Sequence, residues 1–86
     1  MSPSLRRVRL SQAVARGIRA ERARRGISQN ELAAMLNWSR EKLSAIESGR
    51  QRIATDDLAI ICRIFNLPLS SLIPELDDDD RQALGL

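Results

Sequence analysis

The sequence lacks several residue types on which enzyme and metal chemistry depend. Its 86 residues include no His, no Tyr and a single Cys, Cys62, which lies inside an apolar run. One Cys without His provides neither a disulfide framework nor a thiol or imidazole metal site. Because no nucleophile or acid–base group has a recognisable partner, an enzyme is the least favoured class. We therefore expect no catalytic residues, no metal and no cofactor.

Long hydrophobic runs are also missing. The longest are about five residues, far below the roughly 18 that span a bilayer, and the first ten residues hold no signal-like apolar stretch. We expect a cytoplasmic protein without a membrane partner. A chain this short forms one small domain that buries only roughly 60 to 65% of its unfolded surface, which makes self-association an early hypothesis.

Lysine is nearly absent, so Arg supplies 13 of the 14 basic residues. Arg suits bidentate recognition of phosphate and guanine better than Lys does, although an Arg excess can equally reflect a GC-rich genome. The net charge of +3 hides a segregation along the chain, with +7 over residues 1–30 and −5 over residues 53–86. The basic half is predicted to face an anionic partner. The run Asp77 to Asp80 is typical of a solvated cap rather than a cation site.

Helix-capping residues divide the chain into helices, and there is no strand-like alternation. Ser11 is a candidate N-cap for a first helix over residues 11–25, closed by Gly26. Ser28 and Glu31 form a capping box that opens a second helix, and Asn37 has the left-handed tendency that ends it.

A third helix is predicted over residues 40–48, only three residues after the second, which is the spacing of a helix-turn-helix. Two more are predicted, one after the acid-rich start Thr55 to Asp57 and a short one over residues 69–73. A further stub could follow the Asp run and end at Gly85.

This succession resembles the phage Cro/repressor-type helix-turn-helix family, also called the xenobiotic-response-element-like bacterial regulators. The resemblance extends from Gly17 to Ile73 and rests on Arg22 with residues 26–33, on residues 43–49, and on residues 58–67 with Leu72. Each piece is weak alone, but their order and spacing are specific. The family implies an all-α, compact five-helix domain whose third helix enters the major groove. We divide the chain into a basic N-terminal arm (1–10), the DNA-binding domain (11–76) and an acidic tail or short helix (77–86).

The resemblance implies a DNA-binding set formed by Gln29, Ser39, Arg40, Glu41, Lys42, Ser44, Ala45, Arg50 and Arg52. Arg40 matches the first base-reading position, where a guanidinium reaches guanine O6 and N7, with a phosphate contact as the alternative. Glu41 matches the second, where it can accept from cytosine N4 or instead pair with Lys42 or Arg40.

The other members of this set have supporting roles. Gln29 would touch a phosphate and brace the first recognition side chain, or be a solvated glutamine. Ser44 and Ala45 are small enough for close approach to bases. Lys42, Arg50 and Arg52 are predicted phosphate contacts, each adding about 0.9 to the salt slope of binding, although Arg52 could equally be a solvated loop charge.

Two positions are predicted to be structural. In this family the positions of Arg22 and Glu47 form an ion pair between the first helix and the recognition helix. Arg6, Arg7 and Arg9 would lie in the flexible arm, where they follow the DNA backbone or only solubilise the chain. Glu21 departs from the family pattern, which usually has Leu there.

A dimer interface is predicted from apolar residues beyond what the family core needs: Ile60, Ile64, Leu69, Ile73 and Leu76. The alternative is burial of these residues within one chain, under its tail.

The sequence thus favours a sequence-specific regulator of transcription that binds double-stranded DNA, most simply a repressor on a palindromic operator as a homodimer. The second hypothesis is an antitoxin whose residues 74–86 bind a toxin while the domain autoregulates its operon. A toxin or RNA polymerase is the protein partner that these hypotheses name.

Overall fold

A computed structural model shows a fold made of helices alone over the residues it describes, which are 3–73, 78–83 and 85. The helices are α1 (Pro3–Arg25), α2 (Gln29–Leu36), α3 (Arg40–Glu47), α4 (Thr55–Phe65), α5 (Leu69–Leu72) and α6 (Asp78–Ala83). The all-α prediction is confirmed. The described chain has six helices rather than five because the C-terminal stub is itself helical, with three Asp residues in its first turn, where they complement the helix dipole.

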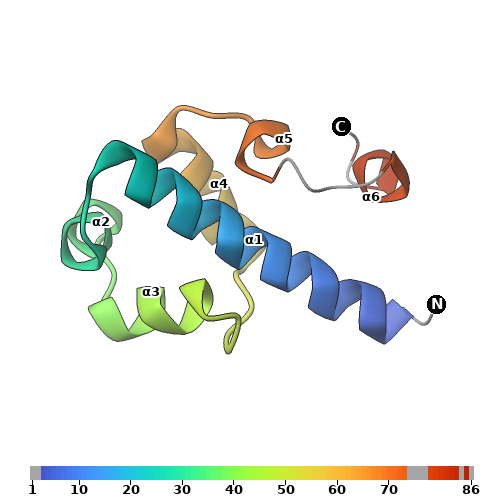
Figure 1. The fold of residues 1–86 in the computed structure, drawn as a ribbon, viewed down its shortest axis with the longest axis horizontal. Helices are drawn as coiled ribbons and strands as arrows, with labels where there is room; N and C mark the ends of the chain where they lie inside the picture. Colours follow the sequence, from blue (N-terminus) through green and yellow to red (C-terminus); the bar gives the residue numbers. More distant parts are fainter. Residues whose placement is uncertain (1–2, 74–77, 84, 86) are drawn as a thin grey trace.

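α1 is longer than predicted. It begins at Pro3 and not at Ser11, so residues 3–10 of the predicted flexible arm form its first turns. Proline suits the first turn of a helix, and no Gly or further Pro interrupts the chain before Gly17, so the Ser11 cap signal was overridden. Figure 1 shows this end of α1 projecting beyond the other helices.

The helix-turn-helix forms as its capping residues indicate. Ser28 Oγ accepts from the Glu31 amide at 3.0 Å, and Glu31 Oε1 accepts from the Ser28 amide at 3.0 Å. The hydrogen bond that the Ser28 amide donates to the carboxylate, followed by a side-chain interaction with Ser28, lowers the pKa of the Glu31 carboxyl. Asn37 ends α2 in the left-handed region with φ of 58°, and Ser39 Oγ then accepts from the Lys42 amide at 3.1 Å to start α3. The predicted three-residue turn between α2 and α3 is confirmed.

The hydrophobic core is formed by buried side chains of α1 to α5 together with Ile73, and Figure 1 shows α1 running across α4. α1 contacts α3 and α5, while α2 contacts α3 and α4. The largest fully buried apolar side chains are Phe65, Ile18, Leu32, Leu43, Ile61 and Ile73. α1 and α5 approach so closely that a Cβ on Gly17 would lie 2.2 Å from the backbone oxygen of Leu72. Only glycine fits at this crossing without a shift of backbone.

The C-terminal end of α1 carries a buried carboxylate. Glu21, at a position where the family usually has Leu, is 6% exposed. Arg24 Nη2 lies 2.5 Å from Glu21 Oε1, and Arg25 Nε lies 2.9 Å from Glu21 Oε2. The hydrogen bonds from Arg24 and then Arg25 lower the pKa of the Glu21 carboxyl against the effect of burial. An ionised group is thereby tolerated at a position where the resemblance leads one to expect Leu.

The predicted dimer interface needs a correction. Ile73 is 1% exposed and belongs to the core of the single chain, where it follows α5, the helix that packs on α1, so it cannot supply apolar surface to a partner. Leu76 lies outside the described residues. Ile60 is 37% exposed, and Ile64 and Leu69 are partly buried against the core. Across the described ranges, no helix is both long enough and apolar enough to cross a bilayer.

Candidate nucleic-acid interface

The C-terminal end of α3 is held by a buried network of charged and polar side chains around Glu47. Glu47 is 1% exposed, and its carboxylate accepts from Arg22 Nε at 3.0 Å and Nη2 at 3.2 Å. Gln29 Nε2 donates to the same carboxylate at 3.0 Å. Arg22 also donates from Nη1 to the backbone oxygen of Ile27 at 3.0 Å. The structure thus brings together the predicted pair of Arg22 and Glu47, and it gives Gln29 a partner in that pair.

Two arginines that the sequence did not single out also join helices. Arg19 Nη1 donates to the backbone oxygen of Glu47, at the C-terminal end of α3. Arg25 Nη2 donates to the backbone oxygen of Phe65, and its guanidinium lies 4.8 Å from the centre of the Phe65 ring. Both place a cation at a helix C-terminus, where the helix dipole favours it. Their partners are 28 and 40 residues away, beyond the reach of local spacing rules.

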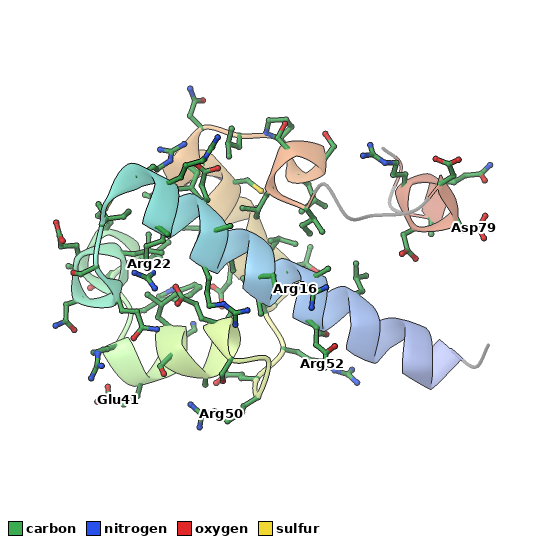
Figure 2. All side chains as sticks on the ribbon, in the orientation of Figure 1. Arg16, Arg22, Glu41, Arg50, Arg52 and Asp79 are labelled. Atoms are coloured by element: carbon green, nitrogen blue, oxygen red, sulfur yellow. The ribbon has the colours of Figure 1, made fainter. Side chains whose placement is uncertain are left out.

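The outer face of α3 is open to solvent. Arg40, Glu41, Ser44 and Arg50 line a hollow of about 220 Å³ on this face. Arg40 and Glu41 are exposed, and in the described part of the chain neither makes an ion pair. Figure 2 shows Glu41, Arg50 and Arg52 pointing outward along the same side of the molecule, away from Asp79 of α6. The predicted base-reading residues Arg40 and Glu41 therefore share one surface with the predicted phosphate contact Arg50.

The other residues of the predicted set differ in how far they are exposed. Ser44 and Ala45 are partly buried, whereas Ser39 is exposed and uses its hydroxyl as the N-cap of α3. Arg50 Nε donates to Ser48 Oγ at 2.9 Å, which leaves the charge of its guanidinium directed to solvent. Arg52 is exposed in the loop between α3 and α4.

Lys42 has a different setting from the other predicted contacts. Its Nζ lies 3.0 Å from Asp57 Oδ2 in the first turn of α4 and 4.3 Å from the centre of the Trp38 ring. From the sequence, Asp57 is expected only to favour the start of a helix. No local signal pointed to this contact, because the two residues lie on different helices.

The electrostatics of the interface follow from these contacts. The rear of α3 is neutralised by the pair of Arg22 and Glu47, while Arg40, Arg50 and Arg52 present positive charge outward. The described residues contain no group of His, Cys, Asp and Glu side chains arranged to hold a metal ion. Such a surface can bind an anionic polymer and present an acceptor, Glu41, among donors.

Comparisons with known proteins agree with this geometry. The family model for helix-turn-helix domains matches residues 18–72, which include α2 and α3. The chain is similar to the crystal structure of the hypothetical transcription factor NHTF from Neisseria, with a TM-score of 0.69 and 28% identity over 87% of this chain and 84% of that one. No match was found among curated proteins. Because the family match spans more than half of the chain and includes the turn described above, the chain belongs to the helix-turn-helix family, as the resemblance predicted.

Proposed function

We propose that this DNA-binding regulator is a sequence-specific repressor that occupies a palindromic operator as a homodimer, with α3 in the major groove. The observation that carries the proposal is the contrast between the two faces of α3. Its inner face is fixed to α1 through Arg22 and Glu47, while its outer face presents Arg40 and Glu41 without ionic partners among the described residues. A recognition helix needs a rigid mount and free donors and acceptors at its N-terminal end.

The two exposed side chains suit opposite base edges. Arg40 can donate two hydrogen bonds to guanine O6 and N7, and Glu41 can accept from cytosine N4. Glu41 also repels phosphates, so it favours a position over the base edges rather than beside the backbone. Arg50 and Arg52 follow α3 in the loop and are proposed to bind phosphates, which fix the register of the protein on the duplex.

Arg40→Ala and Arg52→Ala are expected to behave differently. Loss of Arg40 removes a base contact and should reduce discrimination at one base pair per half-site by about 1–3 kcal/mol. Loss of Arg52 should weaken binding to all duplexes alike. It should also make the negative slope of log K against log salt shallower by about 0.9 per protomer. Fluorescence anisotropy on labelled duplexes at several salt concentrations measures both quantities. Equal behaviour of the two variants would refute the division of roles.

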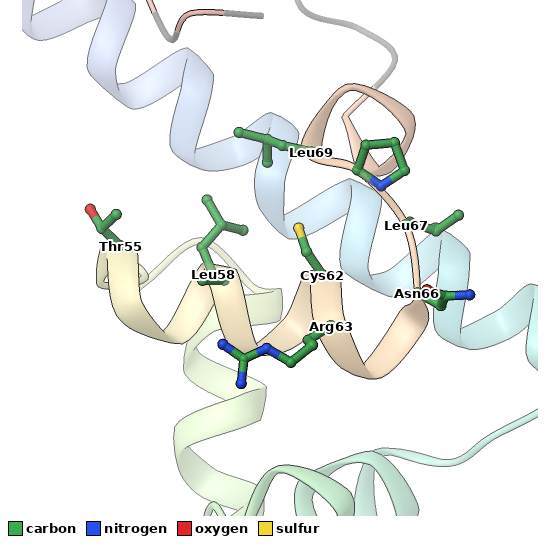
Figure 3. A pocket seen from close by; sticks show the side chains of 9 residues that line it. Thr55, Leu58, Cys62, Arg63, Asn66, Leu67 and Leu69 are labelled. Atoms are coloured by element: carbon green, nitrogen blue, oxygen red, sulfur yellow. The ribbon is translucent and has the colours of Figure 1, made fainter.

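The homodimer is proposed to form through α4 and the start of α5. A groove of about 590 Å³ lies between α4 and the start of α5, and its mainly apolar lining includes Leu58, Cys62 and Leu69 but neither Ile60 nor Ile64, which lie on another side of α4 (Figure 3). Ile60 is one of two large hydrophobic side chains that are exposed among the described residues. Ile60 and Ile64 are neighbours on α4 at a spacing of i, i+4. Apolar surface of this kind on a small domain supports self-association.

Ile60→Glu is expected to shift the protein from dimer to monomer. Because a twofold interface contains the residue twice, two carboxylates would be buried without partners, and we expect the dissociation constant to rise by more than roughly tenfold. Sedimentation equilibrium measures the change. Met35→Glu on α2 is the matched control, since Met35 is the other large exposed apolar residue. A dimer that survives Ile60→Glu would place the interface elsewhere.

A further inference from the structure

Lys42, Asp57 and Trp38 form a contact set that ties three parts of the DNA-binding unit together. Trp38 lies in the turn between α2 and α3, Lys42 in the first turn of α3, and Asp57 in the first turn of α4. The Lys42 Nζ is 3.0 Å from Asp57 Oδ2 and 4.3 Å from the indole centre. The Lys42 and Asp57 side chains are 34% and 23% exposed, so both are partly withdrawn from solvent. The ammonium is thus enclosed by an anion and an aromatic face.

This contact set changes the charge that α3 offers to DNA. Arg40, Arg50 and Arg52 have no ionic partner among the described residues, whereas the charge of Lys42 is balanced by Asp57. Salt dependence of binding measures the cations that replace condensed counterions at phosphates. A lysine that is already paired with a carboxylate releases no net counterion, even when a phosphate lies nearby.

We propose that Asp57 withholds Lys42 from the DNA backbone, so that Lys42 positions the recognition helix and does not bind phosphate. This inference rests on the proposed DNA-binding function. Asp57 then limits affinity for DNA of arbitrary sequence, because one cation fewer per protomer is available for the sequence-independent attraction. Base contacts by Arg40 and Glu41 then contribute a larger share of the binding free energy.

The arrangement follows from the structure of both helix starts. Asp57 lies in the first turn of α4, where the helix dipole favours a carboxylate. Lys42 is placed by the Ser39 cap, whose hydroxyl accepts from the Lys42 amide. Trp38 covers the ammonium on a second side, and a cation over an indole face is attracted to it. Lys42 is therefore held at both its backbone and its charged end.

A double-variant cycle tests the proposal on a labelled duplex pool of random sequence. Asp57→Asn should free Lys42 to bind phosphate. The negative slope of log K against log salt should then become steeper by about 0.9 per protomer. Lys42→Met in that background should return the slope to the wild-type value. If Lys42 binds phosphate in the wild type, the double variant will instead have a slope that is shallower than that of the wild type by about 0.9 per protomer. That result overturns the proposal while leaving DNA binding intact.

Three controls separate failure of this proposal from failure of the proposed function or of folding. If the wild-type protein shows no salt-dependent binding to the pool, the proposed function and this inference both fall. Far-UV circular dichroism checks that each variant folds, and Asp57→Ser provides a second way to remove the carboxylate, with the same expected steepening of the slope.

NMR gives a readout that affinity does not supply. The Lys42 ammonium lies 4.3 Å from the centre of the Trp38 ring, so the protons of the methylene group bonded to it should have upfield shifts that persist when DNA is added to the wild type. In Asp57→Asn those shifts should disappear on addition of DNA. Loss of the shifts in the wild-type complex would contradict the proposal.

Discussion

Arg22→Met is expected to lower the free energy of unfolding by about 3–5 kcal/mol, because it leaves the buried Glu47 carboxylate without its cation. The Glu47 side chain is 2% exposed and takes two hydrogen bonds from the guanidinium of Arg22. Gln29 remains as a neutral donor and cannot balance the charge. For a domain of this size, the melting temperature should fall by more than about 12 °C.

The control for this experiment lies two residues further along α1. Arg24→Met also removes an arginine that is paired with a carboxylate, but the Arg24 side chain is 72% exposed and Glu21 keeps Arg25. We expect little change in stability, because exposed ion pairs are screened by solvent. Replacing both Arg22 by Met and Glu47 by Leu should recover much of the stability, since no unpaired charge is left. If Arg22→Met has the melting temperature of the wild type, the pair of Arg22 and Glu47 does not hold α3 against α1.

Gly17→Ala is the second prediction with a large effect, and its sign is diagnostic. Helix propensity alone predicts a gain of about 0.5–1 kcal/mol, because glycine is a poor residue in a helix interior. The structure predicts a loss of about 2–3 kcal/mol, since the new Cβ would lie 2.2 Å from the backbone oxygen of Leu72 and 3.3 Å from its carbonyl carbon. Backbone atoms cannot rotate away as a flexible side chain can. Chemical denaturation measures the difference.

The same helix provides the reference for propensity. Ala20 is exposed on α1, so Ala20→Gly should cost about 0.5–1 kcal/mol through propensity alone. If Gly17→Ala proves stabilising by a similar amount, α1 and α5 do not approach as closely as described.

The sequence predicted the central helices well because their ends are determined locally. The capping box of Ser28 and Glu31 and the left-handed Asn37 act within three or four residues, and the structure contains all of them. The start of α1 was mispredicted for the same reason. Ser11 has the features of an N-cap, but a helix already under way from Pro3 passes through it. A local cap signal does not show whether the preceding residues are helical.

The parts of the site that the sequence did not predict are contacts between distant residues. Asp57 pairs with Lys42 across two helices, and Arg19 reaches the end of α3 from α1. Burial was likewise not decided by composition, since Ile73 and Ile60 are both isoleucines near the C-terminal end, yet the first is in the core and the second is exposed. These outcomes depend on how α4 and α5 pack, which periodicity alone leaves open.

The central claim is that α3 reads a DNA sequence, and selection from a library of random duplexes tests it most directly. The wild-type protein should enrich one sequence with two inverted half-sites whose centres are about 10 base pairs, or a multiple of that, apart. Enrichment should weaken at a G·C pair of each half-site in Arg40→Ala. Recovery of duplexes with no shared sequence from the wild-type protein would contradict the account.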